Sequence, residues 1–281
     1  MKKIEIKNSS ILNRITLFNG KSLLITDCEK CVLYLYTLES HILKEIDLKS
    51  HLKCPRGLVV LSKENGNEEI YILDYVIGSV FVFNEDFKLV KKCVVNLIKP
   101  SYMSIDSETK FIYVSHSLSD EMTIWDSLNG NLITRSSFQR PLHSKIAGDI
   151  LYLVSMVDCS FDPTEKEKLL NIKAGNFVSL IHKTTMHLLK RLNFVDGFDP
   201  RIVHVTSVHK LWIIAKDIDR NKRVSKNFFL FKINAEHEVI EKVELKDISS
   251  FNDVLYVENK IVICGIGELY PISIIKIVQL K

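Results

Sequence analysis

Short runs of β-branched and aromatic residues recur along this chain, and their repetition limits the folds that it can adopt. The clearest copy contains four such runs, at 54–61, 70–74, 79–84 and 88–94, with polar turns between them. Alternating apolar residues bounded by turn residues are typical of β-strands. This copy is therefore predicted to form four strands joined by turns.

Six copies of this unit can be aligned on its second strand. The aligned segments are 23–27, 70–74, 112–116, 151–155, 211–215 and 261–265. Successive copies lie about 39 to 60 residues apart, which is the spacing of four-stranded propeller blades. The sequence therefore predicts an all-β fold, a six-bladed β-propeller that occupies residues 1–281 as one domain. The expected blades span about 12–49, 55–96, 100–138, 141–195, 200–246 and 250–281, with residues 3–8 added to the last.

The two ends of the chain complement each other in this scheme. The sixth copy stops after its third strand, whereas an extra apolar run, Ile4 to Lys7, precedes the first strand of copy one. Pairing this run with the strand around Ile274 to Ile277 would complete the sixth blade and remove an open sheet edge. We therefore expect the N-terminal strand to close the ring.

The composition of the chain indicates whether it can form a large core, cross a membrane or bind an acidic partner. The chain has 281 residues, of which 46% are apolar and 26% charged, so it can bury a sizeable core. No stretch approaches about 18 consecutive apolar residues, and no signal peptide is readable. We therefore expect a soluble, cytoplasmic protein without a membrane partner. The formal net charge of +4 permits an acidic partner.

The six cysteines raise the question of a metal site or disulfides. Cys28 and Cys31 form a CxxC pair in the turn between two predicted strands, but no second CxxC or histidine pair accompanies them. We therefore expect no metal and no cofactor, and free thiols in a reducing compartment. The remaining cysteines are Cys54, Cys93, Cys159 and Cys264.

The second copy resembles the NHL repeat, in which a proline precedes the first strand and an aspartate ends the second. The matching residues are Pro55, Gly57, Ile72-Leu73-Asp74 and Val80 to Phe83. The third copy, with Thr123 to Asp126, is also similar to WD and YVTN repeats. This resemblance implies a binding platform, because NHL proteins bind RNA or proteins on one face. The terminal aspartate of the second strand occurs only as Asp27 and Asp74.

The loops between blades and those joining second to third strands are expected on one face of a propeller. A basic residue stands beside the proline in four of the loops between blades, and this predicts a ring of Arg56, Lys99, Arg140 and Arg201. Tyr75, Tyr102 and His116 are expected nearby and could stack on bases or side chains, and His143 is a further binding candidate in the loop that contains Arg140. Solvated charge at loop edges is the alternative interpretation.

Two loops between second and third strands are longer than the others. Loop 158–175 contains Asp162-Pro163-Thr164-Glu165, which predicts the start of a short helix. Loop 216–226 carries five basic residues, and loops of this length are often functional. Basic side chains there could neutralise RNA phosphates, although a solvated loop is the alternative. The basic residues are Lys216, Arg220, Lys222, Arg223 and Lys226.

The catalytic interpretation has weaker support in the sequence. Nothing resembles a phosphate-binding loop, a dinucleotide-binding turn or a nucleophile elbow. The residues available at the mouth of the channel are mixed in type and show no repeated ligand set. They are Asp27, Cys28, Asp74, His116, His143 and Cys264.

The leading hypothesis is a non-catalytic platform that docks through its loop-bearing face onto RNA or a ribonucleoprotein such as the ribosome, with no small-molecule substrate. The first alternative is a protein-only scaffold in a multisubunit complex. The second alternative is a propeller enzyme with a metal at the channel mouth. Salt dependence separates phosphate docking from an apolar protein interface.

Overall fold

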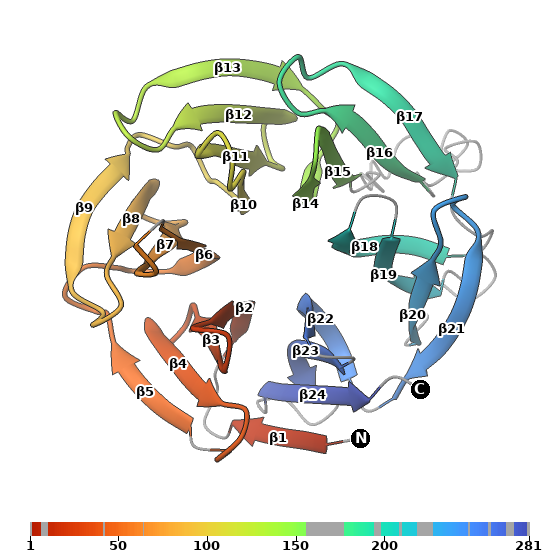
Figure 1. Ribbon diagram of the computed structural model, residues 1–281, viewed down its shortest axis with the longest axis horizontal. Coiled ribbons are helices and arrows are strands. Elements are labelled where there is room, and N and C mark those ends of the chain that lie inside the picture. The colour runs from red at the N-terminus through yellow and green to blue at the C-terminus, as the bar shows by residue number, and fades with distance from the viewer. Residues whose placement is uncertain are drawn as a thin grey trace, which may run out of the picture. The chain divides into compact units, whose positions relative to one another are not determined.

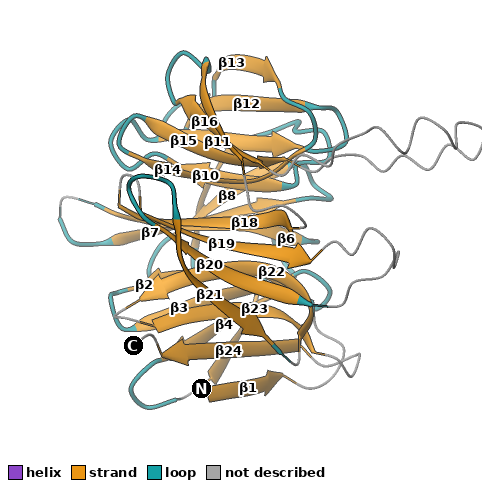
Figure 2. Cartoon of the chain, turned by 90° about the vertical axis from the view of Figure 1, so that its right-hand side faces the viewer, coloured by secondary structure: helices purple, strands orange, loops and turns teal. Residues whose placement is uncertain are grey.

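The computed structural model describes residues 2–6, 11–41, 43–63, 65–155, 177–193, 198–207, 210–217, 227–246, 248–257, 260–267 and 273–279. Every regular element among these residues is a β-strand, and turns join the strands (Figure 2). Among them, no helix has the length and hydropathy needed to cross a lipid bilayer. The predicted loop helix and the loop residues Arg220, Lys222, Arg223 and Lys226 lie outside the described ranges.

The described strands form six sheets of four strands each (Figure 1). The first sheet contains β2 (Leu12–Phe18), β3 (Ser22–Asp27), β4 (Val32–Thr37) and β5 (Leu43–Asp47). The second contains β6 (Pro55–Ser62), β7 (Glu68–Asp74), β8 (Ser79–Phe83) and β9 (Leu89–Val94). The third contains β10 (Tyr102–Ile105), β11 (Phe111–His116), β12 (Glu121–Asp126) and β13 (Leu132–Ser137).

The remaining sheets follow the same order. The fourth contains β14 (Pro141–Ala147), β15 (Ile150–Ser155), β16 (Phe177–His182) and β17 (Leu188–Asn193). The fifth contains β18 (Phe198–Ser207), β19 (Lys210–Asp217), β20 (Phe228–Ile233) and β21 (Val239–Leu245). The sixth joins β22 (Ile248–Val257), β23 (Lys260–Gly267) and β24 (Ser273–Gln279) to β1 (Lys2–Ile6). Each sheet thus corresponds to one predicted copy of the repeat.

The two ends of the chain meet in the sixth sheet. Strand β1 pairs antiparallel with β24, and Ile4 lies opposite Ile275 (Figure 1). The prediction that the N-terminal strand completes this sheet is therefore confirmed. The physical reason is that β24, without β1 beside it, would expose a row of unpaired backbone N–H and C=O groups along one edge of the sheet.

The contacts of the chain divide it into two compact units, each with its own core. Unit 1 comprises residues 1–115, 123–135 and 245–281, and unit 2 comprises residues 116–122 and 136–244. In unit 1, Leu12 and Tyr36 of the first sheet pack with Val262 and Ile275 of the sixth. In unit 2, side chains of the fourth and fifth sheets share one cluster. Alternating apolar residues on adjacent sheets therefore bury each other, as in a layered β structure.

The two tryptophans lie in strands and pack against apolar side chains. Trp212 in β19 is buried, and Trp125 in β12 is half-buried against a core cluster that includes Leu73 and Met103. The Trp125 indole N–H donates to Thr123 Oγ1 over 2.7 Å. Both rings therefore contribute to the packing of their sheets.

Candidate functional site

A β-bulge interrupts the first strand of five sheets close to its start. The bulged residue is left without a partner on the second strand, so the ladder shifts by one residue there. In β6 this residue is Arg56 and in β18 it is Arg201. Two members of the predicted basic ring therefore occupy the same position in different sheets. The equivalent bulges in β2, β14 and β22 contain Asn13, Leu142 and Asn252.

Three predicted site residues lie in unit 1. The Arg56 guanidinium is half-buried and lies over the Tyr75 ring, with Cζ 3.9 Å from the ring centroid. Lys99 is exposed and has a positive φ of 43° in the loop before β10. Tyr102 is only 2% exposed, which leaves its ring little surface for stacking on a base. Arg56 and Lys99 thus reach the surface, and Tyr102 belongs to the interior.

The other described site residues belong to unit 2. Arg140 is half-buried, and its backbone N–H donates to Asp120 Oδ1 over 2.8 Å. Arg201 and Lys216 are also half-buried, whereas His143 is only 1% exposed. A single ring that joins these residues to Arg56 and Lys99 stays a prediction.

Asp27 and Asp74 end the second strands of their sheets and hold the turns that follow. In both residues, Oδ1 accepts the backbone N–H groups two and three positions further on. Asp74 Oδ2 also accepts the N–H groups of Lys53 and Cys54, over 2.6 and 2.7 Å. Asp27 Oδ2 is buried without a hydrogen-bond partner, and burial raises the pKa of this carboxyl. Both side chains therefore stabilise the turn that follows their strand.

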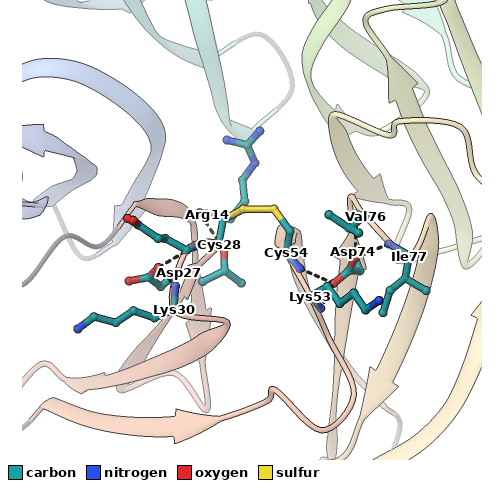
Figure 3. Close-up of a disulfide and its surroundings, with 11 residues drawn as sticks. Arg14, Asp27, Cys28, Lys30, Lys53, Cys54, Asp74, Val76 and Ile77 are labelled. Atoms are coloured by element: carbon teal, nitrogen blue, oxygen red, sulfur yellow. Dashed lines mark hydrogen bonds between the residues drawn. A yellow bond between two sulfur atoms is a disulfide. The ribbon is translucent and has the colours of Figure 1, made fainter.

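The prediction of free thiols was wrong for two cysteines. Cys28, in the turn after β3, forms a disulfide with Cys54, which directly precedes β6 (Figure 3). The partners are 26 residues apart in sequence, but their Cα atoms are 4.5 Å apart because loop ends of adjacent sheets converge. A disulfide is typical of an oxidising compartment, which opposes the reducing compartment inferred from the sequence.

The described cysteines outside this disulfide are free and buried: Cys31, Cys93 and Cys264. Burial raises the pKa of the Cys31 and Cys93 thiols to about 11. They are therefore protonated at neutral pH and are poor nucleophiles. In the part of the chain that the structure describes, no group of three or more His, Cys, Asp or Glu residues could hold a metal ion.

Arg14 is a polar residue of this region that the sequence did not single out. It follows the bulge in β2 and is only 9% exposed. Its guanidinium lies over the Tyr102 ring, with Cζ 4.4 Å from the centroid, and donates to the backbone oxygens of Asn252 and Ser101. The signal available in the sequence was a lone arginine within the apolar run of a first strand.

Comparisons with known proteins establish the fold. No protein-family model and no curated protein matches the sequence. Virginiamycin B lyase from Staphylococcus aureus is similar in structure, with a TM-score of 0.60, 12% identity and coverage of 99% of both chains. A streptogramin B lyase structure gives a TM-score of 0.61 at 10% identity, covering 99% of this chain and 98% of that one.

Hydrazine synthase of Kuenenia stuttgartiensis is also similar, with a TM-score of 0.58 and 17% identity. The match covers 81% of this chain but only 63% of that one. At these identities the likeness concerns the fold alone. The chain is a β-propeller of four-stranded blades.

Proposed function

We propose that the six sheets are the blades of one closed ring and that this propeller is a non-catalytic platform for RNA. The loop-bearing ends of the sheets would dock onto the phosphate backbone. The pairing of β1 with β24 supports closure, because it joins the two ends of the chain in one sheet. Two observations support the non-catalytic interpretation. The carboxylates of Asp27 and Asp74 are engaged in hydrogen bonds to backbone N–H groups, and the thiols of Cys31 and Cys93 are protonated at neutral pH.

The observation that carries this proposal is the charge at the loop ends of unit 1. The carboxylates of Asp27 and Asp74 are buried there, and among the residues that the structure describes at these ends the exposed acids are Glu29 and Asp47. Basic side chains outnumber these two acids, and cations near a surface attract phosphates with little geometric demand. The basic residues at these ends that are exposed or half-buried are Lys30, Lys49, Lys53, Arg56 and Lys99.

A salt series with matched variants tests the docking of RNA. The test variant is Lys53→Gln/Arg56→Gln/Lys99→Gln. The control, Lys21→Gln/Lys44→Gln/Lys88→Gln, removes the same charge from exposed side chains elsewhere. Binding of a fluorescein-labelled 20-nucleotide RNA is measured by anisotropy from 50 to 300 mM KCl. The slope should change by about one unit for each phosphate that the variant no longer neutralises. Equal affinity and slope in the test variant and the wild type would favour the protein-scaffold alternative.

The compartment needs a separate test, because an RNA partner favours the cytoplasm whereas the disulfide favours an oxidising compartment. Cells are treated with a thiol-alkylating reagent before lysis, and Cys28 and Cys54 are then examined by mass spectrometry. Alkylation of both residues supports a cytoplasmic platform. An intact disulfide in cells would argue against an encounter with cytoplasmic RNA.

A further inference from the structure

Arg56 and Tyr75 form a stacked pair at the loop-bearing end of the second sheet. The Arg56 guanidinium lies over the Tyr75 ring, with Cζ 3.9 Å from the ring centroid. This distance corresponds to one stacking layer, so no further ring fits between the two groups. Both side chains are half-buried and therefore keep accessible surface. In the described part of the chain, no carboxylate pairs with the guanidinium, which leaves this planar cation available to a ligand that stacks on it.

Hydrogen bonds between two backbone segments hold this pair in place. Tyr75 directly follows β7, and its N–H donates over 2.9 Å to the carbonyl of Cys54, two residues before Arg56. Figure 3 shows Asp74 between these segments, and its carboxylate accepts two N–H groups from each of them. The four donors are the backbone N–H groups of Lys53, Cys54, Val76 and Ile77. A pair that is fixed in this way loses little conformational freedom when a ligand binds.

Exposed apolar side chains lie on the segments next to this pair. Val76, the neighbour of Tyr75 in the turn after β7, is 60% exposed, and Ile98 is 74% exposed. The segment that carries Ile98 contacts the same turn, because the N–H of Leu97 donates to the carbonyl of Gly78 over 2.9 Å. The surface around the stacked pair therefore offers apolar contacts as well as charge.

This combination favours single-stranded over double-stranded RNA. An A-form duplex presents mainly phosphates and 2′-hydroxyls, whereas a single strand can turn the faces of its bases towards a protein. Guanidinium planes stack on such bases, and exposed cations bind the phosphates that connect them. Lys53 and Lys99 supply exposed cations on the two segments that bind the turn of Tyr75. A duplex would leave the guanidinium plane and the exposed apolar side chains without a contact.

We propose that Arg56 stacks on an unpaired base of single-stranded RNA, while the Tyr75 ring supports the opposite face of the guanidinium. This inference rests on the proposed RNA platform and specifies its ligand. It also revises the expectation that Tyr75 itself stacks on bases, because Arg56 covers one face of that ring. The side chains of Lys53 and Lys99 would bind neighbouring phosphates.

Three fluorescein-labelled RNAs test the proposal on the unchanged full chain. They are a 20-nucleotide oligouridylate, a strand of the same length that has abasic ribose at every position, and a 20-base-pair duplex. In anisotropy titrations at one salt concentration, we expect the oligouridylate to bind on the order of tenfold more tightly than the abasic strand. Equal affinity of the two strands, or tighter binding of the duplex, would overturn base stacking but leave phosphate docking in place. Absence of binding by all three RNAs would overturn the platform and this inference with it.

Arg56→Lys separates stacking from charge, because it keeps the cation and removes the guanidinium plane. We expect its affinity for the oligouridylate to fall on the order of fivefold, and its affinity for the abasic strand to stay within about twofold of the wild type. Arg191→Lys is the matched control, since Arg191 in β17 also lies over a ring, with Cζ 4.7 Å from the Phe177 centroid. Circular dichroism checks that both variants are folded. A folded Arg56→Lys variant that binds the oligouridylate as tightly as the wild type would contradict the stacking.

Discussion

At the scale of single residues, Asp27 and Asp74 show how neighbours change the contribution of one side chain. Both end a second strand and both bind the turn that follows through Oδ1. Only Asp74 has partners for its second oxygen, the N–H groups of Lys53 and Cys54. The same amino acid at equivalent positions therefore stabilises the second sheet more than the first.

This difference predicts unequal effects of the same substitution. Asp74→Asn places an amide where two backbone donors need an acceptor, so we expect it to lower the free energy of unfolding by about 2 to 4 kcal/mol. Asp27→Asn keeps an acceptor for the turn and removes a buried charge, so its cost at pH 7 should be smaller. Urea unfolding of both variants measures this. Equal losses would show that the second oxygen of Asp74 contributes nothing.

The same pair predicts a pH dependence. Burial raises the pKa of Asp27 above the ordinary value of 3.8, so the folded state holds this proton to a higher pH than the unfolded state does. The associated stability is present below the ordinary pKa and is lost as pH rises through the raised one. The free energy of unfolding of the wild type minus that of Asp27→Asn should therefore fall with rising pH in this window. A constant difference would contradict the raised pKa.

The disulfide predicts a stability that depends on redox conditions. A cross-link between residues 26 apart restricts the unfolded chain, with an expected contribution of about 3 kcal/mol. Dithiothreitol should therefore lower the free energy of unfolding of the wild type by this amount. Cys28→Ser/Cys54→Ser is the control, and the reductant should leave it unchanged. A wild type that is insensitive to complete reduction would rule out this contribution.

At the scale of elements, β1 and β24 illustrate how a strand from one end of the chain completes a sheet from the other. Five residue pairs, from Lys2 with Ile277 to Ile6 with Ser273, form this antiparallel ladder. β24 also pairs with β23, so β1 covers its other side. An uncovered β24 would present unpaired backbone groups to another molecule, which promotes aggregation.

Deletion of residues 1–6 should therefore lower the Tm and cause aggregation. The readouts are thermal unfolding followed by circular dichroism, and light scattering of the purified protein. Lys2→Gln/Lys3→Gln is the matched control, because it removes the charges of β1 but keeps its backbone. We expect the control to behave like the wild type. A soluble deletion variant with an unchanged Tm would show that β1 is dispensable.

At the scale of the whole molecule, the shared sheet brings the two ends of the chain together. Lys2 is the register partner of Ile277, so a short linker can join the end of β24 to the start of β1. Chain ends that lie close together usually tolerate circular permutation. In the proposed closed ring, the chain can therefore begin in any loop between blades, provided that each blade keeps its four strands.

A circular permutant tests this interpretation. It joins residues 281 and 1 through a Gly-Ser linker and begins at Lys99, in a loop where Ile98 and Lys99 are exposed. We expect far-ultraviolet circular dichroism like that of the wild type and a Tm within a few degrees of it, because every strand pairing is kept. The same permutant without residues 1–6 is the control and should lose stability. Failure of the full permutant to fold would argue against a ring closed by β1 and β24.

The sequence by itself determined the strands, their grouping in fours and the pairing of the two chain ends. These properties follow from local alternation and from a repeat length, both of which can be read along the chain. The predicted strand Ile4 to Lys7 and the tryptophan-bearing strands needed no knowledge of distant contacts.

Only the tertiary structure decided the disulfide and the surroundings of Arg14. Cys28 meets Cys54, and Arg14 meets the carbonyl of Asn252, a residue 238 positions away. Such contacts depend on the direction in which side chains point at the bulges and turns of neighbouring sheets. A shift of one residue in the register reverses this direction, and the hydrophobic pattern of the sequence does not predict where such a shift occurs.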